Sequence, residues 1–255
     1  MHVTSHCENS GPLSVHSVEG ILPDEAAWFL PCKATTDVVI ASILLFITAP
    51  LIVFLVVLIK ATSRGPAIFK QIRLGRNGRP YHLYKLRSMA HDCELLTGPQ
   101  WATAKDPRVT PLGRFLRRSH LDELPQLWNV IRREMSLVGP RPERPEFVVK
   151  LEQAIPGYRK RLAVLPGITG LAQIQLPPDE NLNDVRRKVA CDLCYLRNIG
   201  PILDLKILVG TTLKVMGFSF AMTRQILDLP GTPGLTLNDE MISADPGSIT
   251  QLQST

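Results

Sequence analysis

The chain lacks several features that would define common protein classes. Its first 32 residues contain no lysine or arginine, and residues 60–91 contain no aspartate or glutamate. Aromatic residues make up only 6% of the chain and form no evident stacking platform, which argues against single-stranded nucleic acid as a partner. No basic n-region and no small-residue cleavage site precede the long apolar segment, so that segment is predicted to be retained.

Cysteine is also scarce. The five cysteines, Cys7, Cys32, Cys93, Cys191 and Cys194, are scattered and suggest no disulfide framework. Cys191 and Cys194 form a C-x-x-C pair, but no second pair or histidine cluster completes a zinc site. We therefore expect these two residues to pack within a helix.

The sequence does contain one long apolar segment, residues 38–59, which carries no charged side chain. As a helix it would be about 33 Å long, enough to cross a bilayer core of about 30 Å. Asp37 is predicted to cap this helix at Val38, after a short helix near residues 24–30. Pro50 removes a backbone donor and should kink or break the helix.

Two topologies follow from Pro50. A kinked helix can span the membrane with the N-terminus outside, or the chain can enter the membrane, turn at Pro50 and return to the cytoplasm. Composition alone favours the spanning form, because transmembrane helices tolerate proline.

A basic stretch follows the apolar segment directly. Its lysines and arginines are Lys60, Arg64, Lys70, Arg73, Arg76, Arg79, Lys85 and Arg87. Such a stretch usually marks the cytoplasmic side and attracts anionic lipid. It fits equally a solvated collar beside the membrane and a surface that binds a phosphate-containing substrate.

Local patterns predict the remaining elements. Gly75-Arg76-Asn77-Gly78 is a strong hairpin signal between residues 67–74 and 81–86. Residues 164–175 predict a turn followed by a strand. Helices are predicted over residues 112–118, 121–131, 183–198 and 202–216. The last of these fits either an interfacial amphipathic helix or a core helix.

The segment from Arg117 to Glu143 is the densest in residues capable of chemistry. Asp122 can act as a nucleophile on phosphorus, and Glu123 can hold a metal or assist proton transfer. Magnesium suits such carboxylates, because it prefers carboxylates together with substrate phosphates. Arg117, Arg118 and Arg141 can neutralise phosphoryl oxygens. The alternative is that Asp122 charges a helix start while the arginines pair with surface acids.

The Gly-Pro-Arg-Pro loop around Arg141 must be rigid and non-helical, because Pro140 and Pro142 flank the arginine. A rigid loop suits an arginine that meets an anion at a fixed position. It also suits an ordinary structural turn.

Taken together, these motifs resemble the bacterial sugar transferase family, the monotopic polyprenyl-phosphate phosphoglycosyl transferases, in their short single-domain form. The resemblance covers roughly residues 33–216. Its matching stretches are residues 33–60, Gly65–Met89, Asp106–Pro142, Leu165–Ile174 and the region around Tyr195–Leu208.

This resemblance implies a reaction. The family transfers a sugar 1-phosphate from a UDP-sugar to a membrane polyprenyl phosphate, undecaprenyl phosphate, and releases UMP. This is the initiating step of surface polysaccharide or glycoconjugate synthesis, before downstream glycosyltransferases act. By resemblance, Asp122 forms a covalent phosphosugar intermediate, Glu123 is its partner, both bind the required Mg²⁺, and Arg117 contacts phosphate. The basic residues Lys85 and Arg87 are expected to bind headgroups or diphosphate.

The resemblance also bears on topology, because the family's anchor is a re-entrant helix broken at a Ser-Pro pair. This chain has Ala49-Pro50 instead, so the serine hydroxyl is missing. Thr48 can substitute by bonding back to a carbonyl. The re-entrant form places the catalytic domain on the cytoplasmic face of the bacterial inner membrane.

The expected fold is thus an α/β, mostly helical, membrane-associated domain with a re-entrant helix broken at Pro50 and interfacial amphipathic helices. Its predicted parts are an N-terminal extension (1–32), a membrane anchor (33–60), a catalytic domain (61–216) and a flexible tail (217–255). Two alternatives remain: a phosphotransferase with another acceptor lipid, and a non-catalytic, membrane-tethered module that binds anionic ligands. Binding by the latter would depend strongly on salt.

Overall fold

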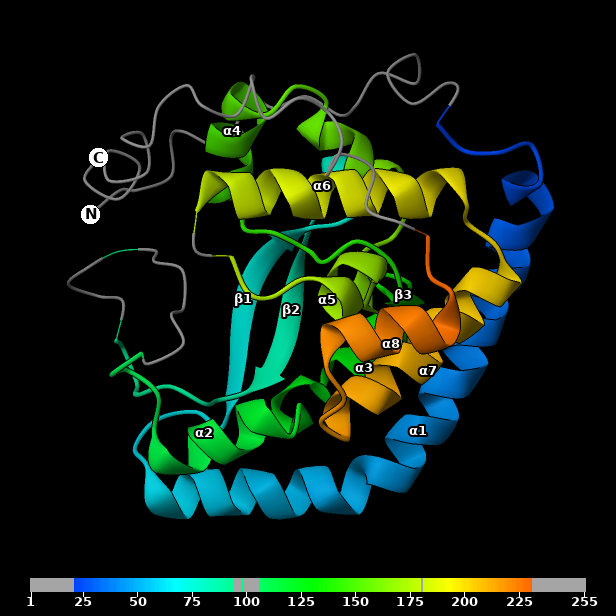
Figure 1. Ribbon diagram of the computed structural model, residues 1–255. Coiled ribbons are helices and arrows are strands. Elements are labelled where there is room, and N and C mark those ends of the chain that lie inside the picture. The colour runs from blue at the N-terminus through cyan, green and yellow to red at the C-terminus, as the bar shows by residue number, and fades with distance from the viewer. Residues whose placement is uncertain (1–20, 94–97, 99–105, 180, 231–255) are drawn as a thin grey trace.

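The computed structural model describes residues 21–93, 98, 106–179 and 181–230, and over these residues the prediction of a mostly helical domain with few strands is confirmed (Figure 1). The helices are α1 (Ala26–Thr62), α2 (Pro111–Arg118), α3 (Gln126–Ile131), α4 (Pro145–Ala154), α5 (Leu171–Gln175), α6 (Leu182–Arg197), α7 (Pro201–Val215) and α8 (Phe220–Leu227). Short 3₁₀ turns are η2 (Arg76–Gly78), η3 (Leu121–Glu123) and η4 (Tyr158–Ala163). The strands are β1 (Ile68–Leu74), β2 (Pro80–Leu86), β3 (Ser136–Val138) and β4 (Gly167–Thr169).

Helix α1 begins earlier than its apolar composition indicates. The predicted start at Val38 is wrong, because the helix begins at Ala26 and Asp37 lies inside it. The prediction of a break at Pro50 is not confirmed, since α1 is helical on both sides of that residue. The helix instead changes direction partway, running down one side of the domain and then along its lower edge (Figure 1). Thr48 Oγ1 donates to the carbonyl of Leu44 at 2.7 Å, as predicted.

Both parts of α1 pack against the domain through a narrow stripe. Phe29 and Ala41 are buried in the main core, and Leu55 and Ile59 are buried in a second cluster with Leu116. The rest of the helix is open: only 11% of its most apolar window is buried. Within the described residues α1 is the one helix long and apolar enough to cross a membrane, and its open surface separates it from the core helix of a soluble protein.

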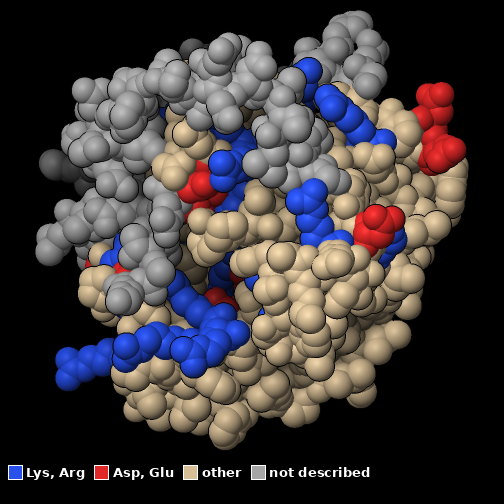
Figure 2. Space-filling model, in the orientation of Figure 1, with Lys and Arg blue, Asp and Glu red and all other residues tan. Residues whose placement is uncertain are grey.

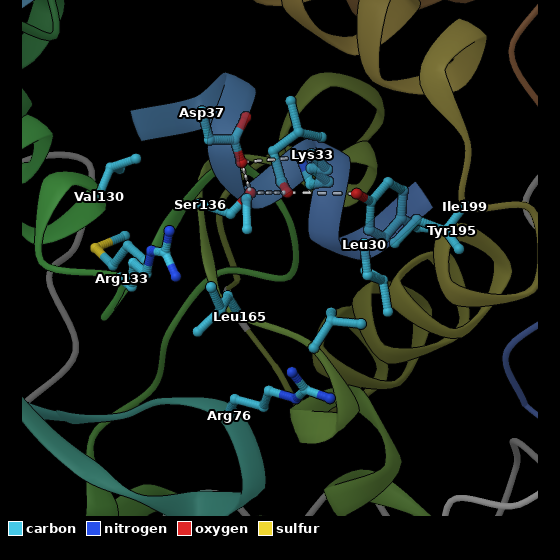
Figure 3. A pocket seen from close by; sticks show the side chains of 14 residues that line it. Leu30, Lys33, Asp37, Arg76, Val130, Arg133, Ser136, Leu165, Tyr195 and Ile199 are labelled. Atoms are coloured by element: carbon cyan, nitrogen blue, oxygen red, sulfur yellow. Dashed lines mark hydrogen bonds and ion pairs between the residues drawn. The ribbon is translucent and has the colours of Figure 1, made fainter. Parts of the chain in front are cut away.

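A buried polar cluster joins the first part of α1 to the domain (Figure 3). Lys33 Nζ lies 2.5 Å from Asp204 Oδ2 and 3.2 Å from Asp37 Oδ2. Ser136 Oγ donates to Asp37 Oδ2 at 2.5 Å, and the Tyr195 hydroxyl donates to Asp204 Oδ1 at 2.8 Å. Because burying a charge is costly unless it is paired, each of these groups requires the others.

The predicted hairpin is confirmed. β1 and β2 are antiparallel, with Ile68 opposite Leu86 and Leu74 opposite Pro80. The turn between them places Asn77 at a φ of 57° and Gly78 at a φ of 74°, the left-handed region that asparagine and glycine tolerate best.

The hairpin is fastened to α3 by one buried amide. Asn129 accepts a hydrogen bond from the backbone nitrogen of Tyr84 at 3.2 Å and donates to the carbonyl of His82 at 2.7 Å. Strand β2 is thereby held against the helix that follows the candidate catalytic pair.

The turn-and-strand prediction for residues 164–175 is only half right. β4 is three residues long, pairs in parallel with β3, and is followed by α5 rather than by more strand. The backbones approach so closely here that a Cβ on Gly167 would overlap the backbone nitrogen of Gly139, and one on Gly170 would overlap the Gly139 carbonyl oxygen. This contact seats the Gly-Pro-Arg-Pro loop, which is non-helical as predicted.

We expect Gly167→Ala to lower the free energy of unfolding by about 2 kcal/mol or more, because the obstructing atoms belong to the backbone and cannot rotate away. Gly200→Ala is the matched control, since the nearest atom to a Cβ there is 3.9 Å away. Thermal unfolding in detergent measures both. Equal melting temperatures would contradict the close packing of β3 and β4.

The C-terminal part is more ordered than predicted. A flexible tail from residue 217 is wrong for residues 220–227, which form α8, capped by the Ser219 side chain accepting from Met222 N at 3.2 Å. Residues 231–255 lie outside the described residues. α6 is capped by Asn181 and buries Cys191 and Cys194 as predicted.

Helix α7 is buried on one side and exposed on the other. Leu203 and Ile207 are buried in the main core, whereas Ile202 and Leu205 expose 72% and 62% of their surface. The helix is therefore a core helix on one side and an exposed apolar surface on the other, the pattern of a segment at a membrane interface.

Candidate active site

The adjacent carboxylates lie on a short turn between two helices. α2 ends at Arg118, and His120 then adopts a φ of 56°, which reverses the chain into the 3₁₀ turn of Leu121–Glu123. Positive φ is uncommon outside glycine and often accompanies functional sites. Pro125 occupies the N-cap position of α3, so the single helix predicted over residues 121–131 is divided into a 3₁₀ turn and a separate α-helix.

Glu123 is held by two cations. Lys85 Nζ lies 2.8 Å from Glu123 Oε1, and an Arg141 guanidinium nitrogen lies 3.0 Å from the same oxygen. Burial alone would raise the pKa of Glu123, but Lys85 and Arg141 outweigh burial and hold that pKa below its usual range. Glu123 is therefore a fixed, ionised carboxylate.

Asp122 differs from its neighbour. It is only 6% exposed, and no hydrogen bond from the described part of the chain reaches its carboxylate. Burial raises the pKa of Asp122 above its ordinary value, with Lys85 opposing and Glu123 adding to the increase. A desolvated carboxylate without hydrogen bonds is a better nucleophile than a solvated one.

Three other predicted arginines occupy different places. Arg117 Nε donates to Ser88 Oγ at 2.8 Å, and the charge of Arg117 opposes the rise in the pKa of Asp122. Arg118 is exposed at the end of α2. Arg87 is buried and donates to the Ser63 carbonyl at 3.0 Å and to Ser63 Oγ at 2.6 Å, so it fixes the end of α1. The structure thus brings Lys85 to the pair Asp122 and Glu123, called the dyad below, whereas Arg117 contacts Ser88 and Arg87 has a supporting position at the end of α1.

Sequence analysis missed the residues that hold the Arg141 loop. Arg161 donates to the carbonyl of Arg141 at 2.9 Å and lies 2.6 Å from the buried Asp192. Arg73 donates to the next carbonyl, Pro142, at 3.0 Å. These contacts join residues 20 and 69 positions apart, and no local sequence signal announces them.

The dyad fits a magnesium ion that a substrate helps to bind. The described residues contain no group of three or more histidine, cysteine or acidic side chains that could hold a metal alone. Magnesium is commonly bound by one or two carboxylates together with substrate phosphates. Asp122 accepts no hydrogen bond among the described residues, and both cations at Glu123 contact Oε1, which leaves Oε2 for such an ion.

The face of the molecule in Figure 2 is hollowed at its centre, with acidic side chains inside and lysines and arginines at its rim. Below the hollow, the lower edge formed by α1 shows no charged side chain. Charged groups that could meet phosphate thus lie directly above an apolar edge.

Comparison with known proteins identifies the family of this chain. The family model for "Bacterial sugar transferase" matches residues 28–218. The chain belongs to that family. This match confirms the family predicted from the sequence motifs, and it spans α1 and the whole candidate site.

Several relatives carry informative names. A Bacillus subtilis (strain 168) protein, provisionally named an undecaprenyl-phosphate N-acetylgalactosaminyl 1-phosphate transferase, is 48% identical over 55% of this chain and 78% of its own length. A Klebsiella pneumoniae UDP-glucose:undecaprenyl-phosphate glucose-1-phosphate transferase is 39% identical over 71% of this chain. The Rhizobium leguminosarum bv. phaseoli exopolysaccharide production protein PSS is 38% identical over 72% of this chain and 95% of its own length.

The matched lengths differ among these relatives. This chain spans only 39% of the Klebsiella protein, and 40% of a Xanthomonas campestris pv. campestris protein with the same name. The transferred sugar also differs: the name of the Bacillus relative gives N-acetylgalactosamine, and that of the Klebsiella relative gives glucose.

Proposed function

We propose that this protein transfers a sugar 1-phosphate from a UDP-sugar to undecaprenyl phosphate and releases UMP, the first step in building a surface glycan. The observation that carries the proposal is the contrast within the dyad: Glu123 is fixed by two cations, whereas Asp122 is buried without a hydrogen bond among the described residues. Family membership and the names of the relatives support the same reaction.

In this mechanism Asp122 attacks the phosphorus next to the sugar. A bond forms between a carboxylate oxygen and that phosphorus, and the bond to the bridging oxygen breaks, so UMP leaves with the electron pair. The phosphosugar is then held on Asp122 until an oxygen of the acceptor phosphate displaces the carboxylate. Arg117 and Arg141 neutralise phosphoryl charge, and Glu123 keeps Arg141 and Lys85 in place. Asp122 and Glu123 would hold Mg²⁺, whose charge would further neutralise the diphosphate.

The anchor supports placement at a membrane surface. The bend in α1, its open apolar surface and its lower edge without charge favour a helix that enters the bilayer and returns (Figures 1 and 2). We place the catalytic domain on the cytoplasmic face of the bacterial inner membrane, where UDP-sugars and the headgroup of the lipid acceptor meet. The basic residues that follow α1 would contact anionic headgroups there.

The test is UMP release by nanodisc-held protein given Mg²⁺, undecaprenyl phosphate and UDP-sugars one at a time. We expect continuous UMP release with one UDP-sugar. Without the acceptor, release should stop after one stoichiometric amount, and without Mg²⁺ there should be none. Salt-sensitive binding to anionic lipid without UMP release from any UDP-sugar would refute the proposal and favour the non-catalytic module.

A further inference from the structure

A cavity of about 190 Å³ opens between the membrane helix and the dyad. α1 contributes Leu44 and Thr48 to it, the dyad turn contributes Glu123, and α7 contributes Lys214. Most of the exposed surface of its remaining wall is apolar, from Leu124, Leu127, Ile168, Ile174 and Val215, and His120, Thr169, Gln173 and Thr211 complete the wall. The cavity therefore combines an apolar wall, a cation and a catalytic carboxylate with a side of the anchor itself.

Lys214 is the cation of this cavity, and no acidic side chain of the described residues lies within ion-pair distance of it. Its ammonium donates to the carbonyl of Gln173 at 2.7 Å and lies 4.9 Å from the centre of the Phe220 ring. Burial lowers the pKa of Lys214, and the charge of Arg141 adds to that effect. A partly desolvated ammonium that lacks an acidic partner gains most from an anionic ligand.

The shape and position of the cavity decide which anion fits. Pockets that enclose a whole drug-sized ligand usually measure about 300–1,000 Å³, so a cavity of 190 Å³ holds only part of a long molecule. Leu44 and Thr48 belong to the helix whose open surface is apolar, so a chain that leaves the cavity along α1 stays in an apolar environment. A uridine nucleotide would gain little from such a wall, whereas an isoprenyl chain would gain from all of it.

We propose that this cavity is the acceptor site, in which Lys214 binds the phosphate of an isoprenyl phosphate and the first part of the lipid chain lies against Leu124 and Leu127. This inference rests on the proposed function and adds to it the residues that receive the acceptor. Glu123 lines the same cavity, so the bound phosphate lies beside the dyad.

The geometry also accounts for the second half of the reaction. An oxygen of the acceptor phosphate forms a bond to the phosphorus held on Asp122, the bond from phosphorus to the carboxylate oxygen breaks, and Asp122 recovers its electron pair. A phosphate monoester has its second pKa at about 6 and is largely a dianion at neutral pH, so the step needs no general base. Lys214 favours the dianion further and holds it in place.

The experiment measures binding of farnesyl phosphate to the full-length protein in nanodiscs. We expect Lys214→Gln to weaken that binding about tenfold or more, while binding of a UDP-sugar is unchanged. Lys214→Arg keeps the charge and should retain most of the affinity. Lys206→Gln is the matched control, because Lys206 also lies on α7 and also donates to a backbone carbonyl, that of Asp228 at 3.0 Å, but does not line the cavity.

Farnesol separates the contribution of the lipid chain from that of the phosphate. Lys214→Gln should leave the weak binding of farnesol unchanged, because farnesol lacks the phosphate. Equal farnesyl phosphate affinity in wild type and Lys214→Gln would overturn the inference, and so would an equal loss in Lys206→Gln or a loss confined to the UDP-sugar. Since binding is measured without turnover, a Lys214-dependent site in a protein that releases no UMP would refute only the proposed reaction.

Discussion

Asp122→Asn is expected to lower the rate of UMP release by at least about 10³-fold while leaving the fold intact, because the carboxamide has the same shape but is a poor nucleophile. No hydrogen bond among the described residues is lost in the substitution, and a buried charge is removed. The melting temperature should therefore stay the same or rise. A variant that loses activity and gains stability is the signature of a functional carboxylate kept at a cost in stability.

Two comparison variants sharpen this result. Glu123→Gln should lose both activity and stability, because it leaves Lys85 and Arg141 without their carboxylate. Asp179→Asn should be near wild type in activity, although burial raises the pKa of Asp179 as it does that of Asp122. Retention of more than a tenth of wild-type turnover by Asp122→Asn would rule out covalent catalysis by that residue.

Lys33→Met is expected to lower the free energy of unfolding by about 3–5 kcal/mol, because it leaves two buried carboxylates, Asp37 and Asp204, without a cation. Burial already raises the pKa of Asp204, and Lys33 opposes that increase. Without Lys33 the carboxyl group is more readily protonated in the folded state, so the deficit should shrink as the pH falls. Melting temperatures in nanodiscs between neutral and mildly acidic pH measure this trend.

The matched control for Lys33→Met is the triple variant with Asp37→Asn and Asp204→Asn. Its amide oxygens can still accept from Ser136 and Tyr195, so most of the lost stability should return. A deficit that is independent of pH and persists in the triple variant would mean that Lys33 contributes through packing rather than charge.

Local signals in the sequence predicted local structure well. Gly75 to Gly78 specified the hairpin because asparagine and glycine accept the left-handed turn that joins the strands. The start of α1 was missed because Lys33 and Asp37 looked like the polar end of an apolar segment. They are buried only because Asp204, 171 residues from Lys33, lies against them. α8 was missed because the glycine and proline of residues 230–234 dominated the composition of the whole C-terminal segment.

The candidate site likewise contains residues that a local motif predicted and residues whose roles depend on long-range contacts. Asp122, Glu123 and Arg141 were found because they lie within one dense motif, and the structure brings Lys85 to Glu123 from strand β2. The role of Arg161 comes from its contact with the Arg141 carbonyl, and that of Lys214 from its place in the wall of the cavity beside the dyad. Such long-range contacts have no periodicity or spacing from which they could be predicted.

Helix α1 supplies one wall of the cavity beside the dyad, through Leu44 and Thr48, while its two parts pack on the domain at either end. The anchor is therefore not a simple membrane tether. Its length cannot be varied, and its sequence cannot be exchanged for that of another apolar helix, without changing the cavity. Deleting α1 to obtain a water-soluble enzyme would remove a side of the cavity together with the anchor, and a foreign membrane helix would restore attachment without restoring that side.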